Sequence, residues 1–407
     1  MTSLFFHHRF CRVTKASRRF PAALAAIMIR FTLLLLVLAV SSCSLPSPAK
    51  DGNLSRSGAE AAIRAQWTER KSQLEEERAD EFQAKAIELS GKTLRWEERV
   101  FGEAPTNGHS LWISMHGGGN APARVNDRQW TNQISLYKPA EGIYVAPRAP
   151  TDTWNLWHEA HIDPMFDRLI EDYVVLRGVN PDRVYIMGYS AGGDGVWQLA
   201  PRMADRWAAA AMMAGHPNDA SLLSLRNLPF ALFVGGNDAA YDRNKIVAER
   251  AAELDKLREA DPGGYEHFAR VYPGLPHWMN RKDAEALPWM AAHTRNPWPG
   301  KVVWQQDDVT HTRFYWLAVP QAAAKAGNRI VAEVNGQSIL LTGDVPKGVT
   351  LRLSDRLTNL NSPLRVTVNG REVFQGRVTR RTEVIRQSLQ ERADPRSAAT
   401  AELTVDW

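Results

Sequence analysis

Short apolar runs that end at glycine or proline alternate with amphipathic stretches through the middle of the chain, and this alternation constrains the fold most. Between the runs, residues 163–178 carry Met165, Leu169 and Val174 near one helical face. Strands that alternate with helices form mainly parallel sheets with helices on both faces. The sequence therefore predicts an α/β fold. The strand-like runs are residues 94–100, 111–116, 142–147, 183–188, 228–236 and 265–274.

The flanking regions follow other patterns. Residues 59–89 are helical in composition, with Ile63, Trp67, Leu74 and Phe82 along one face, and we expect this helix to pack on the main domain. After residue 298 the chain reads as short strands. Two Asn-Gly pairs there are typical of hairpin turns, because both positions of such turns need positive φ. We expect residues 299–407 to form a small β-rich domain. The pairs are Asn335-Gly336 and Asn369-Gly370.

The sequence leaves the role of this β-rich domain open, and a small sandwich is the form we expect for it. We expect residues 59–298 to form one domain, with the helix at its start.

The N-terminal tenth of the chain carries the whole basic excess. Residues 1–42 hold six Lys and Arg side chains and no acid, so the net charge of +5 leaves about −1 for the remainder. A nucleic-acid-binding domain would need clustered cations within the folded part, so we expect no nucleic-acid partner. Residues 31–40 are apolar but too few to span a bilayer, which takes about 20 residues. They fit the apolar region of a secretory signal.

Small residues and Cys43 follow this apolar run. The arrangement resembles a bacterial lipoprotein signal, in which the cysteine is lipidated and becomes the new N-terminus. The alternatives are an ordinary signal peptide cut near Ser42, or an uncleaved anchor. Met28 would give a compact signal of its own, so the start codon is either Met1 or Met28. We expect residues 1–42 to be the signal and residues 43–58 to be a flexible tether to the bacterial envelope.

Cysteine is rare in this chain. Cys11 lies in the expected signal and Cys43 would carry lipid. The mature domain would then have no disulfide, no thiol chemistry and no metal site of the cysteine type. We expect no metal and no cofactor.

Ser190 lies at the centre of a G-x-S-x-G motif formed by residues 188–192. The motif alone is weak, but a buried-type strand (183–188) precedes it and a helix-forming stretch (195–204) follows. A strand, a sharp turn and a helix are what a nucleophile elbow requires. The turn exposes the serine hydroxyl at the end of the strand, and the helix N-terminus stabilises developing negative charge.

A glycine-rich loop and two ordered side chains accompany this serine. Residues 116–120, with the sequence HGGGN, follow an earlier strand. They free backbone N–H groups for an oxyanion hole, with Ala191 and either Gly117 or Gly118 as the expected donors.

In this architecture the acid and then the histidine follow the serine along the chain. Asp238 comes just after a strand end and is preferred to Asp242. His277 follows the last strand of the expected sheet and is preferred to His293. A further histidine, His216, precedes the acid and is therefore out of order.

Residues 90–295 resemble the α/β-hydrolase superfamily. The stretches HGGGN, GYSAGGDGVWQLA and ADRWAAAAMMAG are similar to secreted esterases of the poly(3-hydroxybutyrate) depolymerase and feruloyl esterase type, and to peptidases related to prolyl oligopeptidase. The resemblance implies Ser190 as nucleophile, His277 as general base and acid, and Asp238 as the residue that orients it. It also implies an oxyanion hole at Gly117, Gly118 and Ala191.

Aromatic side chains near these motifs suggest a substrate cleft. Trp154 and Trp157 follow a strand end, and Trp278 adjoins the expected base. Aromatic walls suit sugars, phenolic acids or other apolar acyl groups. The alternative is that these tryptophans cover the core, which is also what we expect of residues 313–316 in the β-rich domain.

These features predict a serine hydrolase that cleaves esters, of small molecules or of polymers, through an acyl-enzyme. A serine peptidase with the same residues is one alternative. A non-catalytic protein that binds polysaccharide on a hydrolase scaffold is another. A nucleotide-binding function is disfavoured, because the chain lacks a G-x-x-x-x-G-K-[ST] motif.

Overall fold

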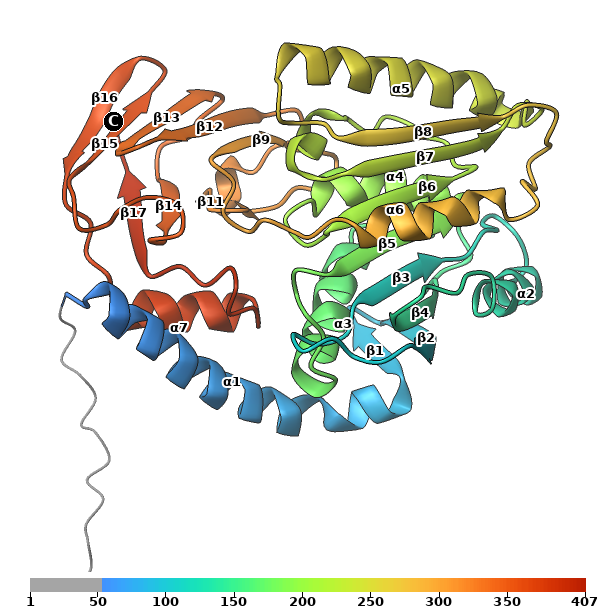
Figure 1. Cartoon of the computed structure of the whole chain (residues 1–407), viewed down its shortest axis with the longest axis horizontal. Helices are drawn as coiled ribbons and strands as arrows, with labels where there is room; N and C mark the ends of the chain where they lie inside the picture. Colours follow the sequence, from blue (N-terminus) through green and yellow to red (C-terminus); the bar gives the residue numbers. More distant parts are fainter. Residues whose placement is uncertain (1–52) are drawn as a thin grey trace, which may run out of the picture. The chain divides into compact units, whose positions relative to one another are not determined.

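An eight-stranded sheet forms the centre of the computed structural model, which describes residues 53–407 (Figure 1). The strand order is β1-β2-β4-β3-β5-β6-β7-β8, in which β1 and β2 run antiparallel to their neighbours and β3 to β8 are parallel. This is the α/β-hydrolase arrangement, so the predicted α/β class is confirmed. The strands are β1 Ala86–Leu89, β2 Lys92–Phe101, β3 Leu111–Met115, β4 Gly142–Arg148, β5 Val184–Tyr189, β6 Ala209–Met213, β7 Phe230–Gly235 and β8 His267–Tyr272.

Helices cover both faces of this sheet. Side chains of one strand alternate between two apolar layers: Ile113 and Met115 pack in the layer that contains α3, α4 and α5, whereas Trp112 packs in the layer that contains α2 and α6. Because helices cover both faces of the sheet, β3 to β7 are buried along their whole length and are largely apolar. The helices are α2 Ala123–Gln133, α3 Ile162–Leu176, α4 Ala191–Arg202, α5 Arg243–Ala260 and α6 Ala286–Ala291.

The N-terminal helix differs from the prediction at both ends. Helix α1 spans Arg56–Ala84, so residues 56–58, expected in the tether, form its first turn, and Ser55 caps it by accepting the Gly58 N–H. The helix ends at Lys85, whose backbone adopts the left-handed conformation. Residues 86–89 form β1 instead of helix, because Ser90 and Gly91 both have positive φ and turn the chain into β2.

Helix α1 packs on the main domain, as expected. Leu74 is buried against Val175 of α3 and Ala393 near the C-terminus, and Phe82 packs on the main core. Within residues 53–407, no helix combines the length and the apolar character needed to cross a bilayer. The predicted signal and Cys43 lie outside the described residues.

The C-terminal part contains two sheets, and both contribute to the same apolar cluster. Asn369 and Gly370 form the predicted turn, whereas the other hairpin turns one residue later than expected, at Gly336 and Gln337. Two elements were not predicted, the helix α7 Thr382–Glu391 and the strand that follows it at residues 401–405. The five-stranded sheet has the order β16-β15-β13-β12-β9 and the four-stranded sheet the order β10-β11-β14-β17. The strands are β9 Lys301–Gln305, β10 Arg313–Phe314, β11 Leu317–Ala318, β12 Arg329–Asn335, β13 Ser338–Gly343, β14 Val349–Leu353, β15 Leu364–Val368, β16 Arg371–Gly376 and β17 Ala401–Val405.

Buried polar contacts join the C-terminal part to the α/β part. Arg295 bonds Asp394 at 2.7 Å and Asp182 at 2.8 Å, and the Tyr315 hydroxyl donates to the Ala204 carbonyl at 3.0 Å. The described residues belong to one compact unit, and the boundary expected at residues 298–299 stays a prediction.

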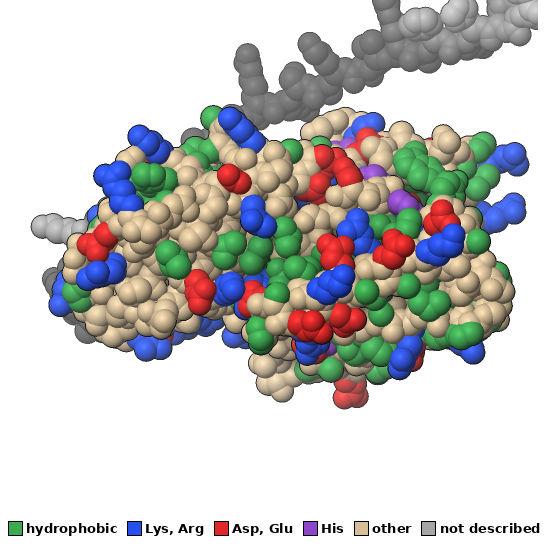
Figure 2. All heavy atoms as spheres, turned by 90° about the horizontal axis from the view of Figure 1, so that it is seen from above, with side chains coloured by type: hydrophobic (Ala, Val, Ile, Leu, Met, Phe, Trp, Pro, Cys, Tyr) green, Lys and Arg blue, Asp and Glu red, His purple; other side chains and the backbone are tan. Residues whose placement is uncertain are grey.

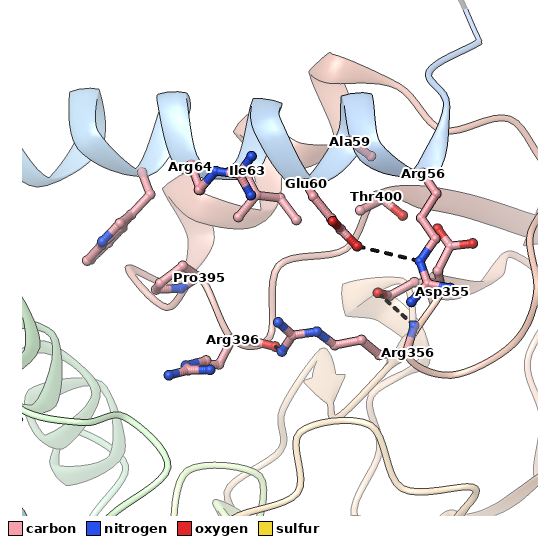
Figure 3. A pocket seen from close by; sticks show the side chains of 12 residues that line it. Arg56, Ala59, Glu60, Ile63, Arg64, Asp355, Arg356, Pro395, Arg396 and Thr400 are labelled. Carbon is pink, nitrogen blue, oxygen red and sulfur yellow. Dashed lines mark hydrogen bonds and ion pairs between the residues drawn. The ribbon is translucent and has the colours of Figure 1, made fainter. Parts of the chain in front are cut away.

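A cavity of about 520 Å³ lies between α1 and the C-terminal part (Figure 3). Arginines from three segments line it, among them Arg64, Arg356 and Arg396, and Glu60 points toward Arg56. Figure 2 shows cationic and anionic side chains interspersed over the face it displays, in keeping with the near-neutral charge of the chain beyond residue 42.

Candidate active site

Ser190 occupies a strained turn between β5 and α4. Its φ of 58° and ψ of −121° are rarely adopted by residues with a side chain. The glycines on either side permit the turn: a Cβ on Gly188 would lie 2.2 Å from the Gly192 carbonyl oxygen, and one on Gly192 would lie 2.2 Å from the Met115 carbonyl oxygen. The predicted strand, turn and helix are therefore present, with both glycines required by the close approach of backbone segments.

The structure brings Ser190, His277 and Asp238 into one hydrogen-bonded chain. His277 Nε2 lies 3.0 Å from Ser190 Oγ, and its Nδ1 lies 2.7 Å from Asp238 Oδ2. The Asp238 side chain is buried, while that of His277 is 40% exposed and thus open to a substrate. The geometry is that of a nucleophile, a base and the acid that orients the base.

The acid and the two histidines that the sequence did not favour, Asp242, His216 and His293, form other contacts. Asp242 is exposed and pairs with Lys245 at 2.9 Å. The ring of His216 bonds Asn218, and that of His293 packs edge-on against Trp289 at a centroid distance of 4.5 Å. None of the three makes a hydrogen bond to Ser190, His277 or Asp238 among the contacts of residues 53–407.

A tyrosine next to the nucleophile holds the histidine loop. The Tyr189 hydroxyl donates to the His277 carbonyl at 2.6 Å and accepts the Met279 N–H at 3.2 Å. Burial raises the pKa of Tyr189, which keeps its hydroxyl protonated as a donor. The ring also packs against Trp278 at a centroid distance of 5.7 Å. Sequence reasoning missed this role, because a tyrosine inside a motif carries no signal of a partner 88 residues away.

The glycine loop lies against the nucleophile. A Cβ on Gly117 would be 3.1 Å from the Ser190 Cβ, and Gly118 has a φ of 115°. Ala191, as the first residue of α4, has an N–H without a partner inside the helix. The expected oxyanion-hole residues are therefore assembled beside Ser190. Asn126 of α2, which was not predicted, fixes the loop by accepting the Gly119 N–H at 2.9 Å.

His116 is buried and fixed in one tautomer. Its Nε2 lies 3.1 Å from the Ala149 N–H and must accept that hydrogen, so Nδ1 carries the proton that it donates to the Gly117 carbonyl at 2.6 Å. Burial lowers the pKa of His116 to about 4. The neutral ring thereby orients the peptide that leads into the glycine loop.

A second buried acid lies in the helix that follows Ser190. Asp194, in the first turn of α4, accepts the His216 backbone N–H at 2.6 Å. Burial raises the pKa of Asp194 to about 6. Among the hydrogen bonds of residues 53–407, none joins the Asp194 carboxylate to Ser190 Oγ or His277, so Asp238 remains the carboxylate of the hydrogen-bonded chain.

A cavity of about 800 Å³ opens beside Ser190, which is a size that holds a small ligand. Of the three predicted cleft tryptophans, Trp278 lines it. Trp154 is exposed and packs against Tyr241 at a centroid distance of 5.7 Å, outside the cavity lining. The prediction for Trp157 is wrong: its side chain is 0% exposed and donates its indole N–H to the His116 carbonyl, so it supports the glycine loop from within the core.

Comparisons with known proteins add a fold-level likeness. No family model matches the chain, and no curated protein matches it. A thermostable esterase is similar over 52% of this chain and 62% of its own, at 17% identity and a TM-score of 0.39. That match thus spans less than two thirds of the esterase.

Two further solved structures cover a similar share of the chain. The feruloyl esterase module from Clostridium thermocellum matches 49% of this chain and 82% of its own, at 18% identity and a TM-score of 0.34. A dipeptidyl aminopeptidase IV-like protein from Bacteroides ovatus matches 51% of this chain and 35% of its own, at 10% identity and a TM-score of 0.38.

Proposed function

We propose that the protein is a serine hydrolase that cleaves carboxylic esters through an acyl-enzyme. One observation carries the proposal: Asp238, His277 and Ser190 form a continuous hydrogen-bonded chain, with Ser190 on a strained turn beside a glycine loop. A serine hydroxyl becomes a strong nucleophile when a positioned base removes its proton, and this arrangement provides that base.

In the first half of the reaction, Ser190 Oγ attacks the ester carbonyl carbon while His277 Nε2 takes the hydroxyl proton. Asp238 accepts the Nδ1–H and stabilises the charged imidazole. The carbonyl oxygen gains negative charge, which the N–H groups of Ala191 and of Gly117 or Gly118 stabilise. The carbon–oxygen bond to the alcohol then breaks, and the alcohol leaves with the proton from His277.

In the second half, a water molecule attacks the acyl-enzyme. His277 removes a proton from that water, and the same N–H groups stabilise the second oxyanion. The bond between the acyl carbon and Ser190 Oγ breaks, and Oγ recovers its proton from His277. The products are one carboxylic acid and one alcohol, and the enzyme returns to its starting state.

The lining of the cavity favours an ester over a peptide with a free amino terminus. Holding such a terminus calls for a carboxylate, and no Asp or Glu is found among the described residues that line the cavity. Comparing acyl esters of p-nitrophenol, feruloylated or acetylated sugars and short peptides tests this choice. We expect a burst of p-nitrophenol equal to the enzyme concentration and no turnover by Ser190→Ala. Peptide cleavage without ester turnover would contradict the proposal.

We further propose that the enzyme is attached to the bacterial envelope through lipid at Cys43. This rests on the sequence alone: an apolar run and small residues precede the cysteine. The full-length chain should fractionate with membranes, and Cys43→Ser should be released to the soluble fraction. A Cys43→Ser variant that stays membrane-bound contradicts the lipid anchor, while leaving the hydrolase proposal untouched.

A further inference from the structure

A cation lines the cavity that contains the nucleophile. Arg281 borders the same cavity as Ser190 and His277. Both Asn280 and Arg281 have positive φ, 55° and 61°, a backbone conformation that residues with a side chain seldom adopt. Two consecutive left-handed residues therefore need support from the surrounding structure.

That support comes from hydrogen bonds on both sides of the turn. Before it, the Met279 N–H bonds the Tyr189 hydroxyl. After it, the Lys282 N–H bonds the Met279 carbonyl at 3.1 Å, and the Ala284 N–H bonds the Arg281 carbonyl at 3.1 Å. The backbone that presents Arg281 is thus tied to the residue preceding the nucleophile.

Nearby acids are engaged elsewhere. Asp283 is buried and accepts the Tyr137 hydroxyl. Glu285 accepts the Tyr272 hydroxyl at 2.6 Å and lies 3.5 Å from Arg270. Across residues 53–407, Arg281 forms no ion pair within 4.0 Å. Its guanidinium is therefore available to a ligand.

Helix α2 contributes a polar and uncharged part of the cavity lining. Gln129 and Asn132 lie one helical turn apart on α2 and both line the cavity. No described side chain or backbone group bonds their amides, whereas the neighbouring Gln133 amide is used by Ser114 at 2.7 Å. Trp278 and Leu136 supply the apolar surface. The Arg281 guanidinium, the two side-chain amides without a partner among the described residues and the small apolar surface fit an anionic ligand that also carries polar groups and a small apolar part.

We propose that the substrate is an ester of which one half carries a carboxylate, and that Arg281 binds this carboxylate. A guanidinium matches the planar carboxylate with two parallel hydrogen bonds. The inference rests on the proposed esterase function. The carboxylate takes no part in the bond changes, since it only anchors one half of the ester while Ser190 acts on the other end.

Two matched pairs of esters test the proposal on either side of the scissile bond. Mono-p-nitrophenyl adipate against p-nitrophenyl hexanoate places the carboxylate on the acyl side. 4-Acetoxybenzoate against phenyl acetate places it on the alcohol side. Background hydrolysis is taken from Ser190→Ala. The ratio of kcat/KM for the charged and neutral esters is compared between wild type and Arg281→Gln, so that the intrinsic reactivity of each ester cancels.

We expect the ratio to fall about five- to thirtyfold in Arg281→Gln for at least one pair, as for a partly exposed charge-assisted contact. Arg281→Lys should keep part of the preference, and added salt should weaken it. Lys282→Gln removes an adjacent charge that does not line the cavity and should leave the ratio unchanged.

Two results would overturn the proposal. The first is an unchanged ratio in Arg281→Gln for both pairs. The second is an equal fall in Lys282→Gln, which would reflect the general field of the protein. If the neutral esters are cleaved and Ser190 reacts with a fluorophosphonate in either case, only the assignment of Arg281 fails. If no ester is cleaved and Ser190 stays unlabelled, the esterase proposal fails and this inference falls with it.

Discussion

Replacing Tyr189 by phenylalanine should both slow catalysis and destabilise the fold. The change keeps the ring and removes the hydroxyl that bonds the His277 carbonyl at 2.6 Å and the Met279 N–H at 3.2 Å. Met279 is buried, so its N–H loses its partner at a cost of about 1–3 kcal/mol, whereas water can reach the exposed side of His277. We expect a loss of about 2 kcal/mol in the free energy of unfolding.

The effect on rate follows from the position of His277. A displacement of a reacting group by about 1 Å lowers rates by about a hundredfold, so we expect kcat to fall about ten- to hundredfold. The assay is p-nitrophenyl ester hydrolysis at saturating substrate, together with denaturant unfolding. The matched control is Tyr185→Phe. Tyr185 lies on the same strand, β5, and its hydroxyl donates to the His293 carbonyl at 3.0 Å. An unchanged kcat in Tyr189→Phe, or an equal loss in both variants, would refute the reasoning.

Three further predictions concern the nucleophile turn and the glycine loop. Ser190→Gly should be about 1 kcal/mol more stable to denaturant than Ser190→Ala, because only glycine adopts the turn conformation without strain, and both should lack esterase activity. Gly192→Ala should lose more than about 2 kcal/mol of unfolding free energy or fail to fold, whereas Gly300→Ala, whose Cβ would meet only one atom at 3.9 Å, should lose less than about 1 kcal/mol. The pKa of His116 is about 4 in the folded protein and about 6.5 in the unfolded chain. As the pH falls from 6.5 to 4, the unfolded chain takes up a proton that the folded protein does not bind, so the free energy of unfolding of the wild type should fall by about 3 kcal/mol. The His116→Gln variant should not show this fall, and denaturant unfolding of both proteins at both pH values measures the difference. An equal fall in unfolding free energy in the wild type and the variant would contradict the prediction.

Features set by local sterics and chain order were predictable from the sequence. Gly188 and Gly192 are required by backbone contacts within the turn itself, so the motif and its flanking strand and helix predicted the turn. The order of Ser190, Asp238 and His277 followed from the order of strands in a parallel sheet, whose carboxyl ends share one edge.

Features set by distant partners were not predictable. Trp157 looked like a cleft residue, but tertiary packing places it beneath His116, and no local pattern distinguishes the two positions. Asn126 reaches the glycine loop from a helix that is mostly polar in sequence. The boundary between helix and strand near Lys85 depended on a left-handed cap and a two-residue turn, which helical composition alone does not reveal.

Labelling with a fluorophosphonate tests the central claim most directly. The reagent forms a covalent bond only with a serine whose hydroxyl is activated by a base, and peptide mass spectrometry identifies the modified residue. The account predicts stoichiometric labelling of Ser190 in the folded protein, and strongly slowed labelling in His277→Ala. Folded protein that stays unlabelled, or carries the label on another serine, would contradict the account.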